Sequence, residues 1–295
     1  MEGACLCLRL INVLTNTKLF LMKLYHYTTI DALALILKNK TLKFSRLDCV
    51  DDLEEGRVES SGIKLGKHFF ASCWTENPEE SIPLWKMYSG DSYGVRISLD
   101  KDMFKKYHIS SGTYNGISVE GSIECLLPVE EIFYKEYIPF PPNITPSSID
   151  SFFYRKVEYV DDVFKAAEDI VHIIAKDGNK ADMKIALGDV GRFKHKRWAF
   201  QQETRFVLSF LPINPMHCNP ANVSSLVMQA YLSDIHVPFN NYFLHLRDDV
   251  FDNLEIVLSP MATKGHRVIV ESLCATYAPK AEIRDSSLGT LVKLK

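Results

Sequence analysis

The chain has 295 residues, of which 46% are hydrophobic and 24% charged, with 14 glycines and 13 prolines. These values are ordinary for a globular protein and exclude a disordered or fibrous chain. The formal net charge of −3 gives no overall field that would hold nucleic acid, so any such contact must come from a local basic patch.

Residues 1–21 are predicted to be an N-terminal extension, and residues 22–295 a single folded domain. Residues 6–21 are fairly apolar, but Arg9 and Lys18 interrupt them and they lack the small-residue ending of a signal peptide. No apolar run approaches the roughly 20 residues that span a bilayer. The seven cysteines include only one close pair, C-x-C at 5–7, which favours free thiols in a reducing cytosol over a zinc site. We therefore expect a cytoplasmic protein that holds no metal and binds no membrane.

The first third of the chain is predicted to contain short strands and two helices. The strands are expected at residues 24–28, 42–45, 69–74 and 93–99. Thr29 is the expected N-cap of the first helix, and Asn39 its left-handed stop. Pro83 suits an early position of the second helix, because a proline there costs no helical hydrogen bond.

The rest of the chain continues this mixed pattern without an internal repeat. Strands are expected at residues 123–129, 132–137, 203–210, 254–258 and 281–284, and helices at 150–177, 180–194 and 264–275. Residues 139–146 are proline-rich and are expected to form a loop. Strands and helices do not alternate regularly and no G-x-G-x-x-G follows a strand, which argues against a dinucleotide-binding Rossmann domain. The pattern predicts an α+β fold with a central, mostly antiparallel sheet flanked by helices, and a helical insertion around residues 150–195.

The strand at 24–28 carries a candidate pair of polar side chains. His26 and Thr28 are two residues apart, so on a strand they point to the same face. Together they would present two hydrogen-bonding groups to one cleft. The alternative is a satisfied histidine at the end of a strand.

A second candidate pair begins the strand expected after residue 200. Gln201 and Glu203 would share a face of an extended segment, and Arg205 would continue that face. A carboxylate and an amide in this arrangement suit a sugar hydroxyl and an incoming nucleophile. The alternative is an exposed strand edge with solvated polar residues.

A third candidate lies on the helix that contains Pro83. Trp85 and Tyr88 are three residues apart, so they stack on one side of the helix. They would form an aromatic wall for a flat heterocycle such as nicotinamide or adenine. The alternative is ordinary core packing.

Six segments, taken in order, resemble a large bacterial family of domains of unknown function. They are LYHYTT at 24–29, KFSRL at 43–47, DDLEEG at 51–56, WKMY at 85–88, GVRISLD at 94–100 and WAFQQETR at 198–205. The resemblance runs from about residue 22 to Leu288. The chain departs from the family pattern at Asp51, Leu53 and Glu54, which replace the usual Asn, Pro and Phe, and at Gln201, which replaces a Glu.

That family is in turn similar to the ADP-ribosyltransferase superfamily, particularly its His-Tyr-Glu branch and the DarT-type toxins. The resemblance implies a split central sheet and NAD as substrate. It also implies that His26 and Thr28 hold the nicotinamide ribose, and that the backbone of Tyr27 contacts the carboxamide.

The same resemblance implies roles for three further side chains. Tyr88 would stack on nicotinamide, and Glu203 would be the catalytic glutamate. Gln201 would complete a Q-x-E form of the catalytic strand. An anionic carboxylate against the ribose would stabilise the oxocarbenium-like state in which the nicotinamide–ribose bond breaks.

Two arginines and a serine complete the expected NAD-binding residues. Arg46 and Arg205 are candidates for the diphosphate, because a guanidinium matches the geometry of phosphate oxygens. Ser45 precedes Arg46 in the KFSRL segment. The alternative for both arginines is a structural or surface ion pair.

The run RFKHKRW at 192–198 places four fixed positive charges and two aromatic rings just before Glu203. Such a run can follow a single-stranded nucleic acid, with its aromatic rings stacked on bases. The alternative is a solvated helix end, where cations are favoured. The first interpretation makes an RNA or DNA base the expected acceptor. The DarT resemblance implies the same acceptor, and a toxin or phage-defence role with a neutralising antitoxin partner.

The leading hypothesis is therefore an NAD-dependent mono-ADP-ribosyltransferase that modifies nucleic acid. An NAD glycohydrolase and a catalytically inactive nucleotide- or protein-binding module are the alternatives. A cysteine mechanism is disfavoured because Cys73 lies in an apolar strand, and no H-E-x-x-H or phosphate-binding G-x-x-x-x-G-K-[ST] motif is present.

Overall fold

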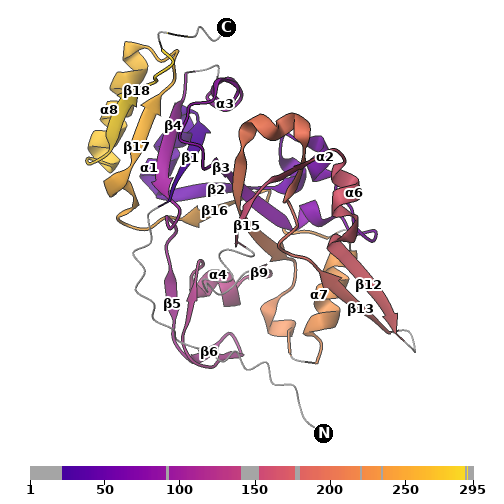
Figure 1. The fold of residues 1–295 in the computed structure, drawn as a ribbon. Coiled ribbons are helices and arrows are strands. Elements are labelled where there is room, and N and C mark those ends of the chain that lie inside the picture. The colour runs from indigo at the N-terminus through magenta and orange to yellow at the C-terminus, as the bar shows by residue number, and fades with distance from the viewer. Residues whose placement is uncertain are drawn as a thin grey trace.

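A computed structural model describes residues 22–90, 93–140, 153–176, 180–219, 221–233, 235–289 and 291. The predicted extension at 1–21 and most of the proline-rich segment at 139–146 lie outside these ranges. The described residues form an α+β fold around one large mixed sheet, which confirms the predicted fold class (Figure 1).

The main path of the sheet has the strand order β10–β15–β3–β1–β4–β17–β18. These strands span Tyr154–Lys156, Glu203–Leu211, Phe69–Thr75, Lys23–Thr28, Val95–Asp100, Glu255–Leu258 and Glu282–Asp285. Three more strands pair beside this path, namely β2 (Thr41–Arg46), β16 (Asn241–His245) and β9 (Ile138–Phe140). Every described pairing in this sheet is antiparallel except that of β17 with β18.

The sheet divides into two halves between β1 and β3. These strands share a single registered pair, Tyr25 with Thr75. In contrast, β1 pairs with β4 along its whole length, and β3 pairs with β15 from Phe69 to Thr75. The two halves therefore diverge on one side of the Tyr25–Thr75 pair.

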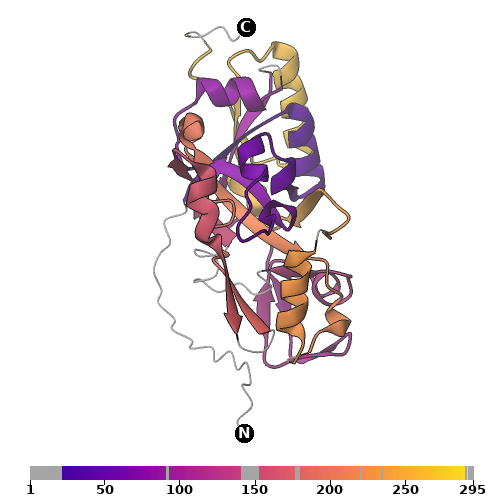
Figure 2. The same ribbon diagram turned by 90° about the vertical axis from the view of Figure 1, so that its right-hand side faces the viewer.

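Helices cover both halves of the sheet (Figures 1 and 2). Helices α1 (Ile30–Asn39) and α8 (Lys264–Tyr277) pack against each other and bury their apolar side chains on β1, β4 and β17. The short helix α3 (Ile82–Tyr88) lies on Tyr27 of β1, with the Trp85 ring edge-on to the Tyr27 ring at 4.9 Å. The other described α-helices are α2 (Leu53–Gly56), α4 (Val129–Phe133), α6 (Val163–Ala167) and α7 (Val223–Leu232).

The start of α1 follows from local sequence signals. The Thr29 side chain accepts a hydrogen bond from the Ala32 amide at 3.1 Å, as expected of an N-cap. The predicted stop is wrong by one residue, because Lys40 rather than Asn39 adopts the left-handed conformation, with φ of 50°. The amide of Lys40 still bonds to the Ile36 carbonyl, so the helix ends in the usual way.

The predicted helices at 150–177 and 180–194 are wrong over most of the described part. This region contains four strands in addition to α6: β10, β11 (Glu158–Val160), β12 (Val171–Lys176) and β13 (Lys180–Ile185), followed by β14 (Phe193–His195). Strands β12 and β13 form a hairpin that projects from the body of the molecule (Figure 1). The β-branched residues Val171, Ile173 and Ile174 favour an extended chain, and this preference prevails over the helix-like spacing.

A second error concerns residues 132–137, which were expected to form a strand. Helix α4 occupies Val129–Phe133, after Pro128 at its N-cap and with Glu130 and Glu131 in its first turn. Acidic residues stabilise a helix N-terminus. Here this preference prevails over the alternation of apolar residues at 132–137 that favoured a strand. The strand expected at 123–129 is present but shorter, as β8 (Ile123–Cys125), which pairs with β5 (Tyr107–Ile109). The hairpin of β6 (Gly112–Tyr114) and β7 (Ile117–Val119) lies between them in the chain.

Burial of His68 predicts a loss of stability in mild acid. His68 is 1% exposed and its ring lies edge-on to Tyr231, and burial lowers the pKa of His68 from 6.5 to about 4. The folded state therefore binds this proton more weakly than the unfolded state. The stabilisation is complete above pH 6.5 and decreases as the pH falls towards 4. We expect the free energy of unfolding to fall by about 2 kcal/mol from this group between pH 7 and pH 5.

Urea unfolding of the wild type and of His68→Phe at both pH values measures this contribution. Phenylalanine keeps an aromatic ring beside Tyr231 but cannot bind a proton, so the variant should lose less stability. An equal loss in both proteins would contradict the assignment to His68.

Within the described residues, no helix is long and apolar enough to cross a membrane.

Candidate functional site

A cleft lies where the two halves of the sheet diverge. It encloses about 580 Å³ of space, which includes its open mouth. Its walls come from β1, β3, β14 and β15, the loop before α2, helix α3, and the 3₁₀ helix η5 (Lys196–Gln201). The lining residues are Tyr25, His26, Tyr27, Val50, Asp51, Cys73, Trp74, Thr75, Leu84, Tyr88, Lys194, Gln201, Glu203 and Arg205.

The ring of His26 bridges the gap between β1 and β3. Its Nδ1 atom lies 2.8 Å from the carbonyl oxygen of Cys73, and its ring is 5.0 Å from that of Trp74. A carbonyl oxygen only accepts hydrogen bonds, so Nδ1 carries the proton and Nε2 is an acceptor in the neutral ring. Burial lowers the pKa of His26, which favours this neutral form. One ring nitrogen of His26, Nδ1, therefore has a hydrogen-bond partner, and the side chain still lines the cleft.

A chain of hydrogen bonds crosses the cleft from Gln201 to Asp51. The Gln201 amide Nε2 donates to the Tyr88 hydroxyl at 2.7 Å, and that hydroxyl donates to Asp51 Oδ2 at 2.8 Å. Burial, with the nearby Asp51 carboxylate, raises the pKa of Tyr88 and keeps its hydroxyl protonated. The Gln201 carbonyl Oε1 is buried without a partner among the described residues. It is therefore an unused acceptor in the wall of the cleft.

Gln201 reaches this position differently from the prediction. It is the last residue of η5, and Gln202 has a positive φ of 44°, so Gln201 and Glu203 do not lie on one extended segment. The left-handed turn at Gln202 brings both side chains to the cleft instead. Glu203 begins β15, a strand between β10 and β3 whose nine residues are all buried, so the exposed-edge alternative is wrong.

Glu203 sits between two cations. Its Oε2 accepts from Lys194 Nζ at 3.1 Å and its Oε1 from Arg205 Nε at 2.6 Å. Glu203 is 6% exposed and Lys194 3% exposed. Burial raises the pKa of Glu203, and the Lys194 ammonium opposes that rise. Burial alone would lower the pKa of Lys194, but the Glu203 carboxylate raises it. The two side chains therefore form a buried ion pair.

Strands β11 and β14 hold Glu203 from outside the main sheet. They pair in parallel, with Tyr159 opposite Lys194. The Tyr159 hydroxyl accepts the backbone N–H of Glu203 at 2.8 Å, while Lys194 binds its carboxylate. The Lys194 ammonium also lies 4.9 Å from the centre of the Trp198 ring. Backbone and side chain of Glu203 are therefore fixed by the same pair of strands.

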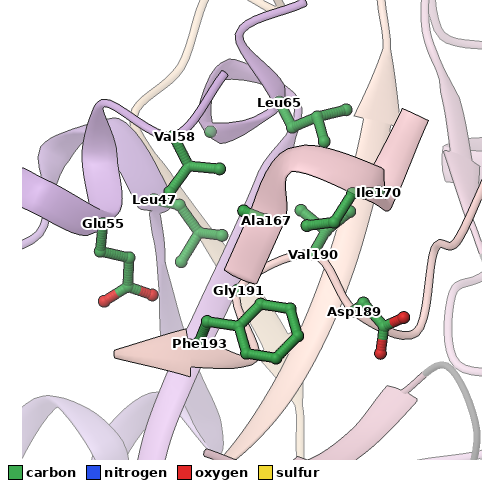
Figure 3. Close-up of a pocket in the computed structure, with 11 residues that line it drawn as sticks. Leu47, Glu55, Val58, Leu65, Ala167, Ile170, Asp189, Val190, Gly191 and Phe193 are labelled. Carbon is green, nitrogen blue, oxygen red and sulfur yellow. The ribbon is translucent and has the colours of Figure 1, made fainter. Parts of the chain in front are cut away.

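Arg205 continues the charge network away from the cleft. Its guanidinium binds both oxygens of Glu55, with Nη2 at 2.9 Å from Oε2, and its Nη1 donates to the Gly191 carbonyl at 2.9 Å. Arg205 is 1% exposed. A small, mainly apolar cavity lies beside Glu55, between α2 and α6 (Figure 3). It has room for about one water molecule and is too small for an organic ligand.

Four of the predicted site residues do not line this cleft. Thr28 is buried and is not among the residues that line the cleft, so it does not join His26 there. Ser45 bonds to Asn241 of β16, and Arg46 binds Asp48 through two hydrogen bonds, at 2.6 and 3.2 Å. Trp85 is fully buried and donates to Glu80 at 3.0 Å. Core packing and ion pairing therefore explain Trp85 and Arg46, and Arg205 is also ion-paired.

The basic run at 192–198 is not an uncompensated positive patch. Each of its four cations has an acidic partner: Arg192 has Asp189 and Glu158, Lys194 has Glu203, Lys196 has Asp161, and Arg197 has Glu54. Lys194 points into the protein rather than to solvent. The predicted helix end is absent too, because β14 and η5 occupy this run. The proposal that this run binds nucleic acid rested on free positive charges, and in the structure these charges are paired with carboxylates.

Asp51, Lys194 and Cys73 line the cleft although the sequence predicted no role for them there. Asp51 lies in the DDLEEG segment, Lys194 in the basic run, and Cys73 in an apolar strand. Burial raises the pKa of Cys73 well above its usual value, so its thiol is a poor nucleophile. The departure at Asp51 from the family pattern was the one available signal for this acid.

Replacing Tyr88 by phenylalanine tests the chain from Gln201 to Asp51. The variant leaves the buried Gln201 amide without an acceptor, which should lower the free energy of unfolding by about 1–3 kcal/mol. Tyr93→Phe is the matched control, because Tyr93 is 40% exposed. Equal stability of the two variants in urea unfolding would contradict the hydrogen-bond chain.

A family model described as protein of unknown function (DUF2971) matches residues 84–206. This part of the chain, from α3 to β15, is thus similar to a domain family of unknown function. No curated protein and no solved structure matches the chain.

Proposed function

We propose that the protein cleaves NAD at the nicotinamide–ribose bond and transfers ADP-ribose to an acceptor. The observation that carries the proposal is the meeting of His26 and Glu203 in one cleft, although they lie far apart in the chain. The resemblance of the ordered sequence segments to ADP-ribosyltransferases supports the same function. The split of the sheet at Tyr25 and Thr75 gives the cleft its position.

The side chains of the cleft suit the chemistry of this cleavage. As the C1′–N bond breaks, the electron pair leaves with nicotinamide and positive charge develops on the ribose. The Glu203 carboxylate is held in a buried site, where a fixed charge stabilises that state more than it would in water. Each carboxylate oxygen has a second lone pair, so the bonds from Lys194 and Arg205 leave acceptor capacity for a ribose hydroxyl.

Gln201 and Tyr88 supply the remaining groups of the proposed site. The unpartnered Gln201 Oε1 accepts a hydrogen bond from a hydroxyl of the ribose or of the acceptor. The Tyr88 ring, held through its hydroxyl by Asp51, stacks on the nicotinamide ring. The acceptor loses one proton as its bond to C1′ forms, and the neutral His26 Nε2 is the base in the cleft with a free lone pair.

The proposed acceptor is a macromolecule, and a nucleic-acid base is the first class to test. This part of the proposal rests on the DarT resemblance, which also motivates a toxin or phage-defence role with an antitoxin partner. The ion-paired run at 192–198 gives it no independent support. Water as acceptor would make the protein an NAD glycohydrolase instead.

A nucleotide-binding module without catalysis is the second candidate. The specific observation in its favour is that both oxygens of Glu203 are already engaged by cations. Such a module would bind NAD and leave it intact.

Incubation of the protein with NAD labelled in the adenylate separates the three functions. Nicotinamide release with label on RNA, single-stranded DNA or lysate protein supports transfer, and release with free ADP-ribose supports hydrolysis. Binding without release supports the module. Tyr93→Phe should behave as the wild type in each assay.

A further inference from the structure

Arg96 is a buried cation on β4, on the same face of the sheet as the cleft. It is paired in register with Tyr27 of β1, and residues paired across neighbouring strands point to the same side. Its guanidinium carbon lies 4.8 Å from the centre of the Tyr25 ring and 5.9 Å from that of Tyr27. Both rings line the cleft, so the guanidinium lies beside two of its lining residues.

Arg96 has no carboxylate partner among the described residues. It is 8% exposed, its Nη1 donates to the Pro78 carbonyl at 2.7 Å, and its Nε is buried without a partner. A buried charge without a counter-ion is costly, and proteins normally pair it. Glu80 is an acidic residue close enough to affect the charge on Tyr27, which Arg96 contacts. Its carboxylate oxygens, however, accept hydrogen bonds from Trp85, Ser286 and Ser287.

The other buried arginines of the described chain are compensated. Arg46 binds Asp48, and Arg205 binds Glu203 and Glu55. Arg155 donates to three backbone carbonyls, those of Leu187, Gly188 and Val190. Arg96, which bonds to the Pro78 carbonyl and to the Tyr27 side chain, has the fewest hydrogen-bond acceptors of these four guanidinium groups.

We propose that Arg96 forms an anion site that binds the diphosphate of a dinucleotide whose ribose lies at Glu203. The inference rests on the proposed function for the position of the ribose. It replaces Arg46 and Arg205, the guanidinium groups expected from the sequence to bind the diphosphate. A guanidinium offers planar, paired donors that match phosphate oxygens, and an anion there supplies the missing counter-charge.

The geometry of the sheet supports a ligand that extends from Glu203 to Arg96. The strands that carry these residues follow the order β15–β3–β1–β4, so β3 and β1 lie between Glu203 and Arg96. Neighbouring strands are about 4.8 Å apart. The rings of Tyr25 and Tyr27, on β1, occupy the interval between Glu203 and Arg96. The extended ligand would run over these two rings.

Titration calorimetry with ADP, inorganic pyrophosphate and adenosine tests the site without requiring catalysis. We expect the wild type to bind ADP and pyrophosphate, and to bind ADP more tightly than adenosine. Arg96→Met should weaken ADP binding by about 10–100-fold and leave adenosine binding unchanged. Arg284→Met is the matched control, because Arg284 lies in the same row of the sheet but is 53% exposed and paired with Glu282. It should keep wild-type affinity.

Three results would overturn the anion site: wild-type affinity for ADP in a folded Arg96→Met, equal binding of ADP and adenosine by the wild type, or no binding of ADP and pyrophosphate at millimolar concentration. If Arg96→Met does not fold, Arg96→Lys replaces it, because lysine keeps the charge but lacks the paired donors and should weaken ADP binding less. Arg96-dependent ADP binding without NAD cleavage would disprove only the proposed function. NAD cleavage with Arg96-independent ADP binding would disprove only the anion site.

Discussion

Replacing Glu203 by glutamine is expected to lower the rate of nicotinamide release from NAD by about 10²–10³-fold. Glutamine has nearly the same size and keeps an acceptor oxygen, but it removes the fixed negative charge that, in the proposed reaction, would face the developing oxocarbenium ion. Because the charge matters most in the transition state, kcat should fall more than the affinity for NAD. Single-turnover release of nicotinamide, with NAD binding measured separately, gives both quantities.

The control for this variant must separate catalysis from folding. Glu203→Gln leaves the buried Lys194 and Arg205 with less compensating charge, which lowers stability as well. The double variant Glu203→Gln with Lys194→Met removes one of the two cations, so it should unfold at higher denaturant concentration than the single variant. Its activity should nevertheless stay as low as that of the single variant. Wild-type activity in either folded variant would refute a catalytic role for Glu203.

Replacing Arg205 by methionine is expected to lower the free energy of unfolding by about 3–5 kcal/mol. Arg205 and Glu55 are 1% and 2% exposed in their side chains, and the variant leaves the Glu55 and Glu203 carboxylates buried without this cation. Removing one partner of a buried ion pair costs far more than removing a surface pair, because the remaining charge cannot reach water. Urea unfolding at pH 7 measures the change.

Two further variants show whether burial is the cause. Arg205→Met with Glu55→Gln removes a charge of each sign and should recover part of the lost stability. Arg267→Met removes a partly exposed arginine that pairs with Glu271 and Asp285 and should change stability by less than about 1 kcal/mol. Similar losses in Arg205→Met and Arg267→Met would contradict the buried network.

Features that depend on neighbouring residues were predictable from the sequence. The Thr29 cap acts over three residues, so the start of α1 was predicted correctly. The strand at 203–210 and the helix at 264–275 also match β15 and α8 closely. The hairpin of β12 and β13 was not predicted. The spacing of its apolar residues suits a helix as well as a strand, and the pairing between the two strands determines which one forms.

The composition of the cleft was only partly predictable for the same reason. The order of the motifs placed His26 and Glu203 in one site, but the sequence could not indicate that Lys194 turns inward to meet Glu203. That contact depends on the pairing of β11 with β14. Arg205 was assigned to phosphate because its partner Glu55 is 150 residues away in the chain. Ion pairs between distant segments leave no periodic signal.

The segment that matches the family, residues 84–206, contains strands that pair with strands outside the segment. Strand β15, which begins inside the match, is paired with β3 at Phe69–Thr75, and β4, which lies inside it, is paired with β1 at Lys23–Thr28. A fragment cut at residue 84 would therefore present two long unpaired strand edges, which are sites of aggregation. These pairings join segments far apart in the chain, so we expect the protein to fold slowly. We also expect residues 84–206 not to fold without the residues before 84.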